Sequence, residues 1–388
     1  MEMEMEEMED DDDGSGGDGG DDYAKDSSAA STARILFSSN SHIYLANYDG
    51  SRFTTTLNAS VPNTDHSWMI FEEPNLLYAL NDIGTNVFLY HLDVDGNKVT
   101  KVTDKQGSGG VVHLEANKAR TRMLGAGYGS GKIDAWNIEN GDLKFIKSIR
   151  STGQLGPNGD RQDAPHPHQS VNDPTGRYFT VNDLGTDSIL LIDSQNDAFN
   201  IVNTVKVQPA GAGPRHGIFY PQGVDKATHY FLLCEMGNLI NVYSVQYDQS
   251  GKGITFTPQQ TISSYGSAPV PQGATAGEIV ISPDNKDVYV SDRLTGKTSD
   301  LIAHLKIHDD GAGKVNLEFV NTVPSGGVSP RMFSVSTDGG HLFVANENGA
   351  NKVAAIVRGP DGAIDASFHG TIAGGAFGQG PQYIKQIR

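Results

Sequence analysis

Charged and histidine side chains recur in short motifs between apolar segments, and their types suit proton transfer beside a bound anion. The motifs PHPH, PRH, CEMGN, GEI, SDR and SPR contain, in chain order, His166, His168, Arg215, His216, Glu235, Glu278, Arg293 and Arg331. An arginine binds a carboxylate or phosphate through two parallel hydrogen bonds. A histidine transfers protons near neutral pH. The set therefore predicts a site that holds an anion and moves a proton.

Glu235 follows the only cysteine, Cys234, in the apolar run HYFLLCEMGN. If Glu235 faces a pocket, its burial should raise its pKa towards that of a general acid or base. Cys234 is expected to be a buried, inert thiol, because a single cysteine forms neither an intrachain disulfide nor a cysteine zinc site. The lack of disulfides slightly favours the cytoplasm. Secretion stays open if the N-terminal tail replaces a natural leader.

Two other patterns could suggest a metal or a phosphate, and the sequence favours neither. His166 and His168 flank Pro167, so in an extended chain they point to opposite sides and do not form a ligand pair. The stretch GAGYGSG, at 125–131, lacks the Lys-Ser/Thr of a phosphate loop, so we predict a hairpin turn there. Asp183 and Asp187 are expected to be turn residues. We predict no metal and no cofactor.

A repeated pattern of short strands must position these side chains. From Ala33 onwards the chain alternates apolar runs with turns rich in Gly, Asn, Asp and Pro. Six copies of one three-strand pattern begin at His66, Val111, His166, Pro214, Gly277 and Pro330. The spacing is about 45–60 residues, as in propeller blades. The N-terminal ARILFSSNSHIYLANYDG and the C-terminal GPQYIKQIR would share a seventh. We therefore predict an all-β, seven-bladed β-propeller over residues 33–388, closed by its two terminal strands.

Residues 1–32 form a separate acidic, glycine-rich segment that we expect to be disordered. Its alternating Met-Glu start resembles an artificial addition. Of the net charge of −18, residues 1–26 contribute −12, from thirteen acidic residues and Lys25. A negative protein is not expected to bind nucleic acid or an anionic membrane. The sequence also has no apolar run long enough for a transmembrane helix and no signal-peptide pattern.

The repeats resemble the seven-bladed lactonase family, which includes 6-phosphogluconolactonase-like propellers and fungal carboxy-cis,cis-muconate cyclases. The resemblance extends over residues 33–388. The segments that carry it are PHPHQSVNDPTGRYFTVNDLGTD, GPRHGIFYP, LCEMGNLINVYSV, GEIVISPDNKDVYVSDR and SPRMFSVSTDGGHLFVANENGANKV.

The resemblance implies a site made of one histidine from PHPH (His168 or His166), Glu235, Arg215 and Arg293. We add Arg331, His216 and Glu278 from their positions at blade starts. The favoured function is metal-free hydrolysis of a small sugar-derived or acidic lactone, with arginines that anchor the substrate. A carboxymuconate-type cycloisomerase and a non-catalytic ligand-binding propeller stay as alternatives. The expected partner is a small molecule. The sequence makes no prediction of oligomeric state.

Overall fold

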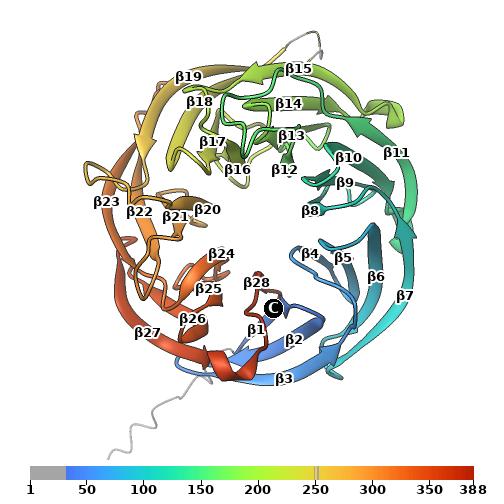
Figure 1. Ribbon diagram of the computed structural model, residues 1–388, viewed down its shortest axis with the longest axis vertical. Coiled ribbons are helices and arrows are strands. Elements are labelled where there is room, and N and C mark those ends of the chain that lie inside the picture. The colour runs from blue at the N-terminus through green and yellow to red at the C-terminus, as the bar shows by residue number, and fades with distance from the viewer. Residues whose placement is uncertain (1–31, 249, 251–252) are drawn as a thin grey trace, which may run out of the picture. The chain divides into compact units, whose positions relative to one another are not determined.

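Seven four-stranded antiparallel sheets are arranged as blades around a central axis in the computed structural model (Figure 1). The structure describes residues 32–248, 250 and 253–388. The prediction of a disordered acidic tail concerns residues that, apart from Thr32, lie outside this part. The predicted all-β, seven-bladed propeller is confirmed. One strand of each blade lines the axis: β4 (Met69–Glu72), β8 (Val111–Ala116), β12 (Pro167–Asn172), β16 (Pro214–Tyr220), β20 (Thr275–Ile281), β24 (Val328–Val335) and β28 (Tyr383–Gln386).

Each blade continues outwards through three more strands. The second strands are β1 (Ala33–Ser39), β5 (Leu76–Leu80), β9 (Arg122–Gly127), β13 (Tyr178–Asp183), β17 (His229–Cys234), β21 (Asp287–Arg293) and β25 (His341–Asn348). The third strands are β2 (His42–Tyr48), β6 (Asn86–Asp93), β10 (Lys132–Asn137), β14 (Ser188–Asp193), β18 (Leu239–Tyr247), β22 (Leu301–Asp309) and β26 (Asn351–Arg358). The outermost strands are β3 (Phe53–Ser60), β7 (Lys98–Gln106), β11 (Lys144–Arg150), β15 (Asn200–Lys206), β19 (Ile254–Ser263), β23 (Val315–Pro324) and β27 (Ile364–Ala373).

The N- and C-terminal strands close the ring in one shared blade, as predicted. The innermost strand β28 pairs antiparallel with β1, so that Phe37 lies opposite Ile384. The Arg34 N–H donates to the Arg388 carbonyl at 2.8 Å, and the Ile387 N–H donates to the Arg34 carbonyl at 2.8 Å. Closure pairs the inner edge of β1, so that this blade has four strands like the others.

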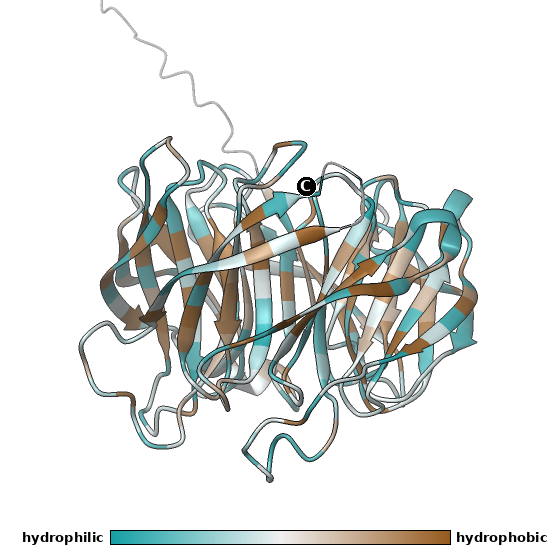
Figure 2. Cartoon of the chain, turned by 90° about the horizontal axis from the view of Figure 1, so that it is seen from above, coloured by the Kyte–Doolittle hydropathy of each residue, from teal (hydrophilic) through white to brown (hydrophobic). Residues whose placement is uncertain are grey.

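Burial explains why β17, a second strand, is mostly apolar while β15, an outermost strand, alternates in exposure. All residues of β17 are buried, whereas β15 alternates exposed and half-buried residues. A strand packed between two neighbouring blades buries both faces, and an outermost strand buries only one. Phe231 and Leu233 of β17, for example, pack against Ile279 and Val290 of the next blade. Figure 2 shows the strands running between two faces of the ring, with loops at both.

The polar turns between the first two strands of a blade are held by their own side chains. In DPTGRY, Asp173 Oδ1 accepts the Tyr178 N–H at 2.7 Å, and Oδ2 accepts the Thr175 hydroxyl at 2.7 Å. Gly176 has φ +83°, which a glycine adopts without strain. The predicted hairpin at 125–131 is also confirmed, because it joins β9 to β10. No helix within the described residues is long and apolar enough to cross a membrane.

The axial channel has two ends, which we name by the strands that line it. The N-terminal mouth is the end at which the innermost strands begin, and the C-terminal mouth is the end at which they finish. Second strands run antiparallel to the innermost ones. A residue that follows a second strand therefore lies at the N-terminal mouth, beside the start of an innermost strand.

Candidate functional site

A buried carboxylate at the N-terminal mouth gathers three arginines around it. Glu235 directly follows β17, Arg215 is the second residue of β16, and Arg293 is the last residue of β21. Glu235 Oε2 lies 3.0 Å from Arg215 Nε and 3.2 Å from Arg293 Nη2. The third partner is Arg161 from the loop between β11 and β12, whose Nη2 lies 2.6 Å from Glu235 Oε1. Two blades and one loop thus meet at a single carboxylate.

The charge of this carboxylate is stabilised, which is the reverse of the expectation from the sequence. Burial alone would raise the pKa of Glu235, but the charges of Arg293, Arg215 and Arg161 outweigh it and lower the pKa to about 2. The prediction of a raised pKa rested on burial and did not include these three cations. Glu235 is therefore ionised at neutral pH and is a very weak base.

Arg215 is enclosed by the protein. Only 1% of its surface is exposed, and its Nη1 donates to the Gly277 carbonyl at 2.5 Å. Burial and the charge of Arg293 lower the pKa of Arg215 to about 9, against the opposing effect of Glu235. It is still protonated at neutral pH. Arg161, Arg215 and Arg293 together exceed the charge of Glu235, so the N-terminal mouth favours an added anion.

His168 lies beside this cluster as a neutral imidazole. Its Nε2 is 3.9 Å from Glu235 Oε2, which is too long for a hydrogen bond. Its Nδ1 is buried and has no hydrogen-bond partner within the described residues. Burial, followed by the charge of Arg215 and the interaction with His216, lowers the pKa of His168 well below its usual value. A neutral imidazole keeps a lone pair that can accept a proton.

His166 is held differently from His168. Its Nδ1 lies 2.8 Å from the Tyr128 carbonyl oxygen, and its Nε2 lies 3.0 Å from Asp163 Oδ1. Its ring stacks on Tyr128 with centroids 4.3 Å apart. Both nitrogens are therefore occupied, and the side chain ties the loop before β12 to the neighbouring blade.

Arg331 adds a fourth cation at the same mouth, near the start of β24. Its guanidinium pairs with Asp82 at 3.2 Å and with Glu347 at 3.3 Å. It is close enough to lower the pKa of His168, after burial and the stronger effects of Arg215 and His216. With 23% of its side chain exposed, against 12% for Arg293, it is accessible from solvent.

His216 and Glu278 lie deeper in the channel. Glu278 Oε1 is 2.8 Å from His216 Nδ1 and also accepts the Ile279 N–H at 3.0 Å. The His216 ring centroid is 5.1 Å from that of His168 and 5.8 Å from that of Trp68. Burial raises the pKa of Glu278 to about 8, against the lowering effect of Arg215. Glu278 is therefore mostly protonated at neutral pH.

Aromatic and histidine rings form a layer across the middle of the channel. Trp68 packs on His113 with ring centroids 4.0 Å apart and meets Tyr383 at 5.6 Å. His113 in turn contacts His216 at 5.7 Å. We call Trp68, His113, His216 and Tyr383 the central layer. Within residues 32–248, 250 and 253–388, no three His, Cys, Asp or Glu side chains are arranged to hold a metal ion.

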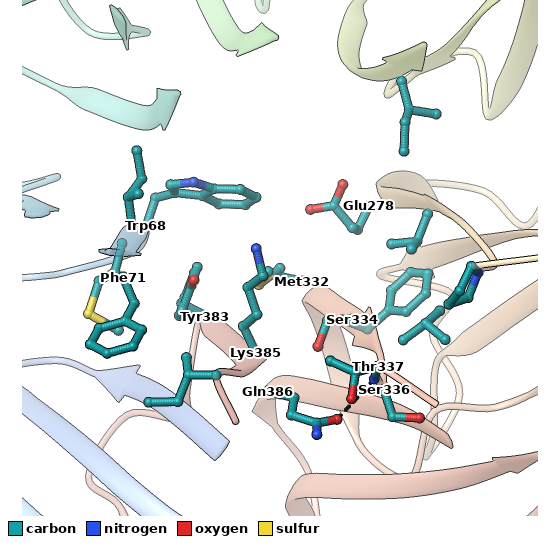
Figure 3. Close-up of a pocket in the computed structure, with 18 of the residues that line it drawn as sticks. Trp68, Phe71, Glu278, Met332, Ser334, Ser336, Thr337, Tyr383, Lys385 and Gln386 are labelled. Carbon is teal, nitrogen blue, oxygen red and sulfur yellow. Dashed lines mark hydrogen bonds between the residues drawn. The ribbon is translucent and has the colours of Figure 1, made fainter. Parts of the chain in front are cut away.

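The structure thus distributes the eight predicted residues over three places. His168, Arg215, Glu235 and Arg293 converge at the N-terminal mouth, with Arg331 and His166 beside them. Glu278 instead lines a cavity of about 610 Å³ at the C-terminal mouth, with Trp68 and Lys385 (Figure 3). His216 belongs to the central layer, between the two mouths.

Sequence reasoning missed several residues of the channel. Trp68 and His113 stand at the starts of two repeat copies, in HSWM and VVH, where position alone could have indicated them. Arg161 gave no such signal, because it belongs to a loop outside the repeat. Cys234 is buried, as predicted, and burial raises the pKa of its thiol.

Comparisons with known proteins agree with this fold. Residues 29–367 match the family described as lactonase, 7-bladed beta-propeller. A protein of Arthroderma benhamiae, named a probable 6-phosphogluconolactonase, is 33% identical over 326 residues, which are 79% of this chain and 78% of that protein.

Two solved structures share the fold at lower identity. A Bacteroides fragilis protein superposes with a TM-score of 0.77 and 22% identity, over 93% of this chain and 99% of its own. The periplasmic gluconolactonase of Pseudomonas aeruginosa has a TM-score of 0.76 and 19% identity, over 92% of this chain and 99% of its own. Identities this low show the fold alone.

The family match covers most of the chain, so this protein belongs to the lactonase family of seven-bladed β-propellers. The predicted family and the predicted class of enzyme, a lactonase, are thereby confirmed.

Proposed function

We propose that the protein hydrolyses a small sugar-derived or acidic lactone at the N-terminal mouth, by metal-free acid–base catalysis. One observation carries the proposal: a neutral histidine, His168, lies beside a cluster in which arginines outnumber the carboxylate they surround. Ester hydrolysis needs a group that takes a proton from water and cations that stabilise the developing oxyanion. The cluster provides both.

In the proposed reaction, Arg293 polarises the lactone carbonyl and His168 accepts a proton as water attacks the carbonyl carbon. The resulting oxyanion is stabilised by the guanidinium charge. As the tetrahedral intermediate collapses, the ring C–O bond breaks and protonated His168 gives its proton to the leaving alkoxide. The sum is one lactone and one water converted to one hydroxy acid.

Glu235 has a positioning role in this proposal. With a pKa of about 2 it is too weak a base to activate water at neutral pH. Its carboxylate instead fixes Arg161, Arg215 and Arg293 within a few ångströms of one another, where their mutual repulsion would otherwise separate them.

The rim of the mouth suggests how the rest of the substrate binds. Arg161 keeps 38% of its side chain exposed and Arg331 keeps 23%. Either can bind a carboxylate or phosphate carried by the substrate. The name of the Arthroderma benhamiae relative supports a phosphorylated sugar lactone as one such substrate.

The test is a substrate panel read by pH-stat, since lactone hydrolysis releases acid. Gluconolactone, 6-phosphogluconolactone and cis,cis-muconates are compared with the spontaneous rate of each. We expect hydrolysis of at least one sugar lactone and loss of that rate in Arg293→Ala. The matched control, Arg177→Ala, removes an arginine that pairs with Asp193 elsewhere and should behave as the parent. Turnover of muconates without lactone hydrolysis, or turnover of neither, would contradict the proposal.

A further inference from the structure

The C-terminal mouth contains a cavity that the proposed reaction does not use. It has a volume of about 610 Å³ and adjoins a cavity of about 700 Å³ that shares Trp68, Glu115 and Lys385 with it. Figure 3 shows Glu278 and Trp68 on opposite sides of the first cavity, with Lys385 extending its amine between them.

Two residues that line this space carry buried polar atoms without hydrogen-bond partners among the described residues. Glu278 is only 4% exposed, and its Oε2 has no hydrogen-bond partner within the described residues. The Ser334 hydroxyl, which also lines the cavity, is likewise buried and unpartnered there. A buried polar group without a partner is unfavourable, so a ligand that bonds to these atoms gains affinity.

The available groups are hydrogen-bond donors. The Glu278 oxygen without a partner is Oε2, because Oε1 accepts the Ile279 N–H and contacts His216 Nδ1. A carboxyl protonated on Oε2 donates a hydrogen bond to a ligand. Burial raises the pKa of Glu278 to about 8, against the effect of Arg215, which keeps it protonated at neutral pH. Lys385 adds a cation that makes no hydrogen bond or ion pair with the described residues. Three donors therefore favour an acceptor that carries negative charge.

The remaining walls are apolar and include aromatic rings. Trp68, Phe71, Met332, Phe333 and Tyr383 line the same cavity. Pockets for small molecules combine such walls with a few polar groups that fix the orientation of the ligand. A ligand that fits has an apolar ring and a single acidic group.

Acidic residues near Lys385 limit the affinity of this cavity for an anionic ligand. Glu115 interacts with Lys385, but burial raises the pKa of Glu115 to about 7, so it is only partly ionised at neutral pH. Arg120, which also lines the cavity, is paired with Glu72 at 2.8 Å. Lys385 is therefore the cation that a ligand can engage.

We propose that the C-terminal mouth binds a small, ring-bearing monocarboxylic acid, with its carboxylate at Lys385, Glu278 and Ser334 and its ring against Trp68. This site is separated from the arginine cluster by the central layer. The proposal does not rest on lactone hydrolysis.

The two tryptophans of the chain make the test direct. Trp136 is fully buried and does not line the cavity, whereas Trp68 does. In Trp136→Phe, emission reports on Trp68 alone. We titrate this variant with cyclohexanecarboxylate and, as the neutral match, with cyclohexanecarboxamide. We expect a saturable change in emission with the acid. The dissociation constant of the acid should be at least tenfold lower than that of the amide. Calorimetry on the parent gives the same comparison if Trp136→Phe does not fold.

Four substitutions identify the mouth that binds the acid. Lys385→Met should weaken binding of the acid at least tenfold, and Lys385→Arg should restore most of it. The control Lys98→Met removes an exposed lysine of an outermost strand and should change nothing. Equal binding of acid and amide, no saturable binding, or loss of the signal in Arg293→Ala but not in Lys385→Met would overturn the proposal. The titration measures binding alone, so its result is independent of turnover.

Discussion

Replacing Glu235 by glutamine removes the charge that holds three arginines while keeping the shape of the side chain. The carboxylate is 5% exposed and lies within 3.2 Å of Arg161, Arg215 and Arg293. The pKa falls from 4.5 to about 2 because the arginines outweigh the effect of burial. That difference corresponds to about 3 kcal/mol. Removing one partner of a buried ion pair typically costs about 3–5 kcal/mol.

We therefore expect Glu235→Gln to lower the free energy of unfolding by about 3 kcal/mol at pH 7, measured by urea denaturation. The matched control is Asp193→Asn, which breaks the more exposed pair with Arg177 and should cost less than about 1 kcal/mol. A folded pKa below the unfolded value stabilises the protein above the unfolded pKa. The parent should therefore lose its advantage over Glu235→Gln as the pH falls from about 4.5 to 2.

Activity distinguishes a positioning carboxylate from a base. If Glu235 only positions arginines, Glu235→Gln lowers kcat/KM but keeps the acidic limb of the pH–rate profile, which belongs to His168. That limb lies below pH 6.5, because burial and the neighbouring groups lower the pKa of His168. Disappearance of the limb in Glu235→Gln, or equal stability of variant and parent at pH 7, would refute the reasoning.

Three further predictions concern the ring, the tail and metals. Deleting residues 382–388 removes β28 and should destabilise the fold severely, seen as early loss of near-ultraviolet circular dichroism on heating; a truncated chain that melts like the parent would exclude closure by β28. Deleting residues 1–31 should leave the melting temperature within a few degrees, since that segment has little apolar content; a larger loss would show that it packs on the propeller. Exhaustive chelation should leave lactone hydrolysis intact; loss with EDTA that a divalent ion restores would establish metal-dependent catalysis.

The fold could be predicted from the sequence because its determinants are local and repeated. Second strands such as YFLLC and turns such as DPTG recur at blade spacing, and the second strands are mostly buried. The pairing of β28 with β1 could also be predicted, because the N-terminal blade lacked an innermost strand of its own.

The site was only partly accessible to sequence reasoning. The positions of the motifs predicted that His168, Arg215, Glu235 and Arg293 lie close together. The reason is that innermost strands start, and second strands end, at the same mouth. The pKa of Glu235 could not be predicted in the same way. It depends on three cations in space, one of which, Arg161, belongs to a loop without repeat.

The depth of each side chain along the channel was the other property that could not be predicted from the sequence. Glu278 begins its motif much as Arg215 does, yet it lines the C-terminal mouth. Arg215 and Arg331 each directly follow a proline that pairs with the second strand of the blade. Glu278 instead lies two residues beyond Ala276, the last paired residue before the irregularity in β20. The motifs alone did not show this difference in register.

The central claim is that His168 transfers the proton in lactone hydrolysis. The most direct measurement is kcat of His168→Ala on the sugar lactone that the parent hydrolyses fastest, corrected for spontaneous hydrolysis. The control is His91→Ala, an exposed histidine of β6. We expect kcat to fall by about 10²–10⁴-fold in His168→Ala, with KM nearly unchanged and His91→Ala like the parent. A kcat of His168→Ala within about threefold of the parent value would contradict it.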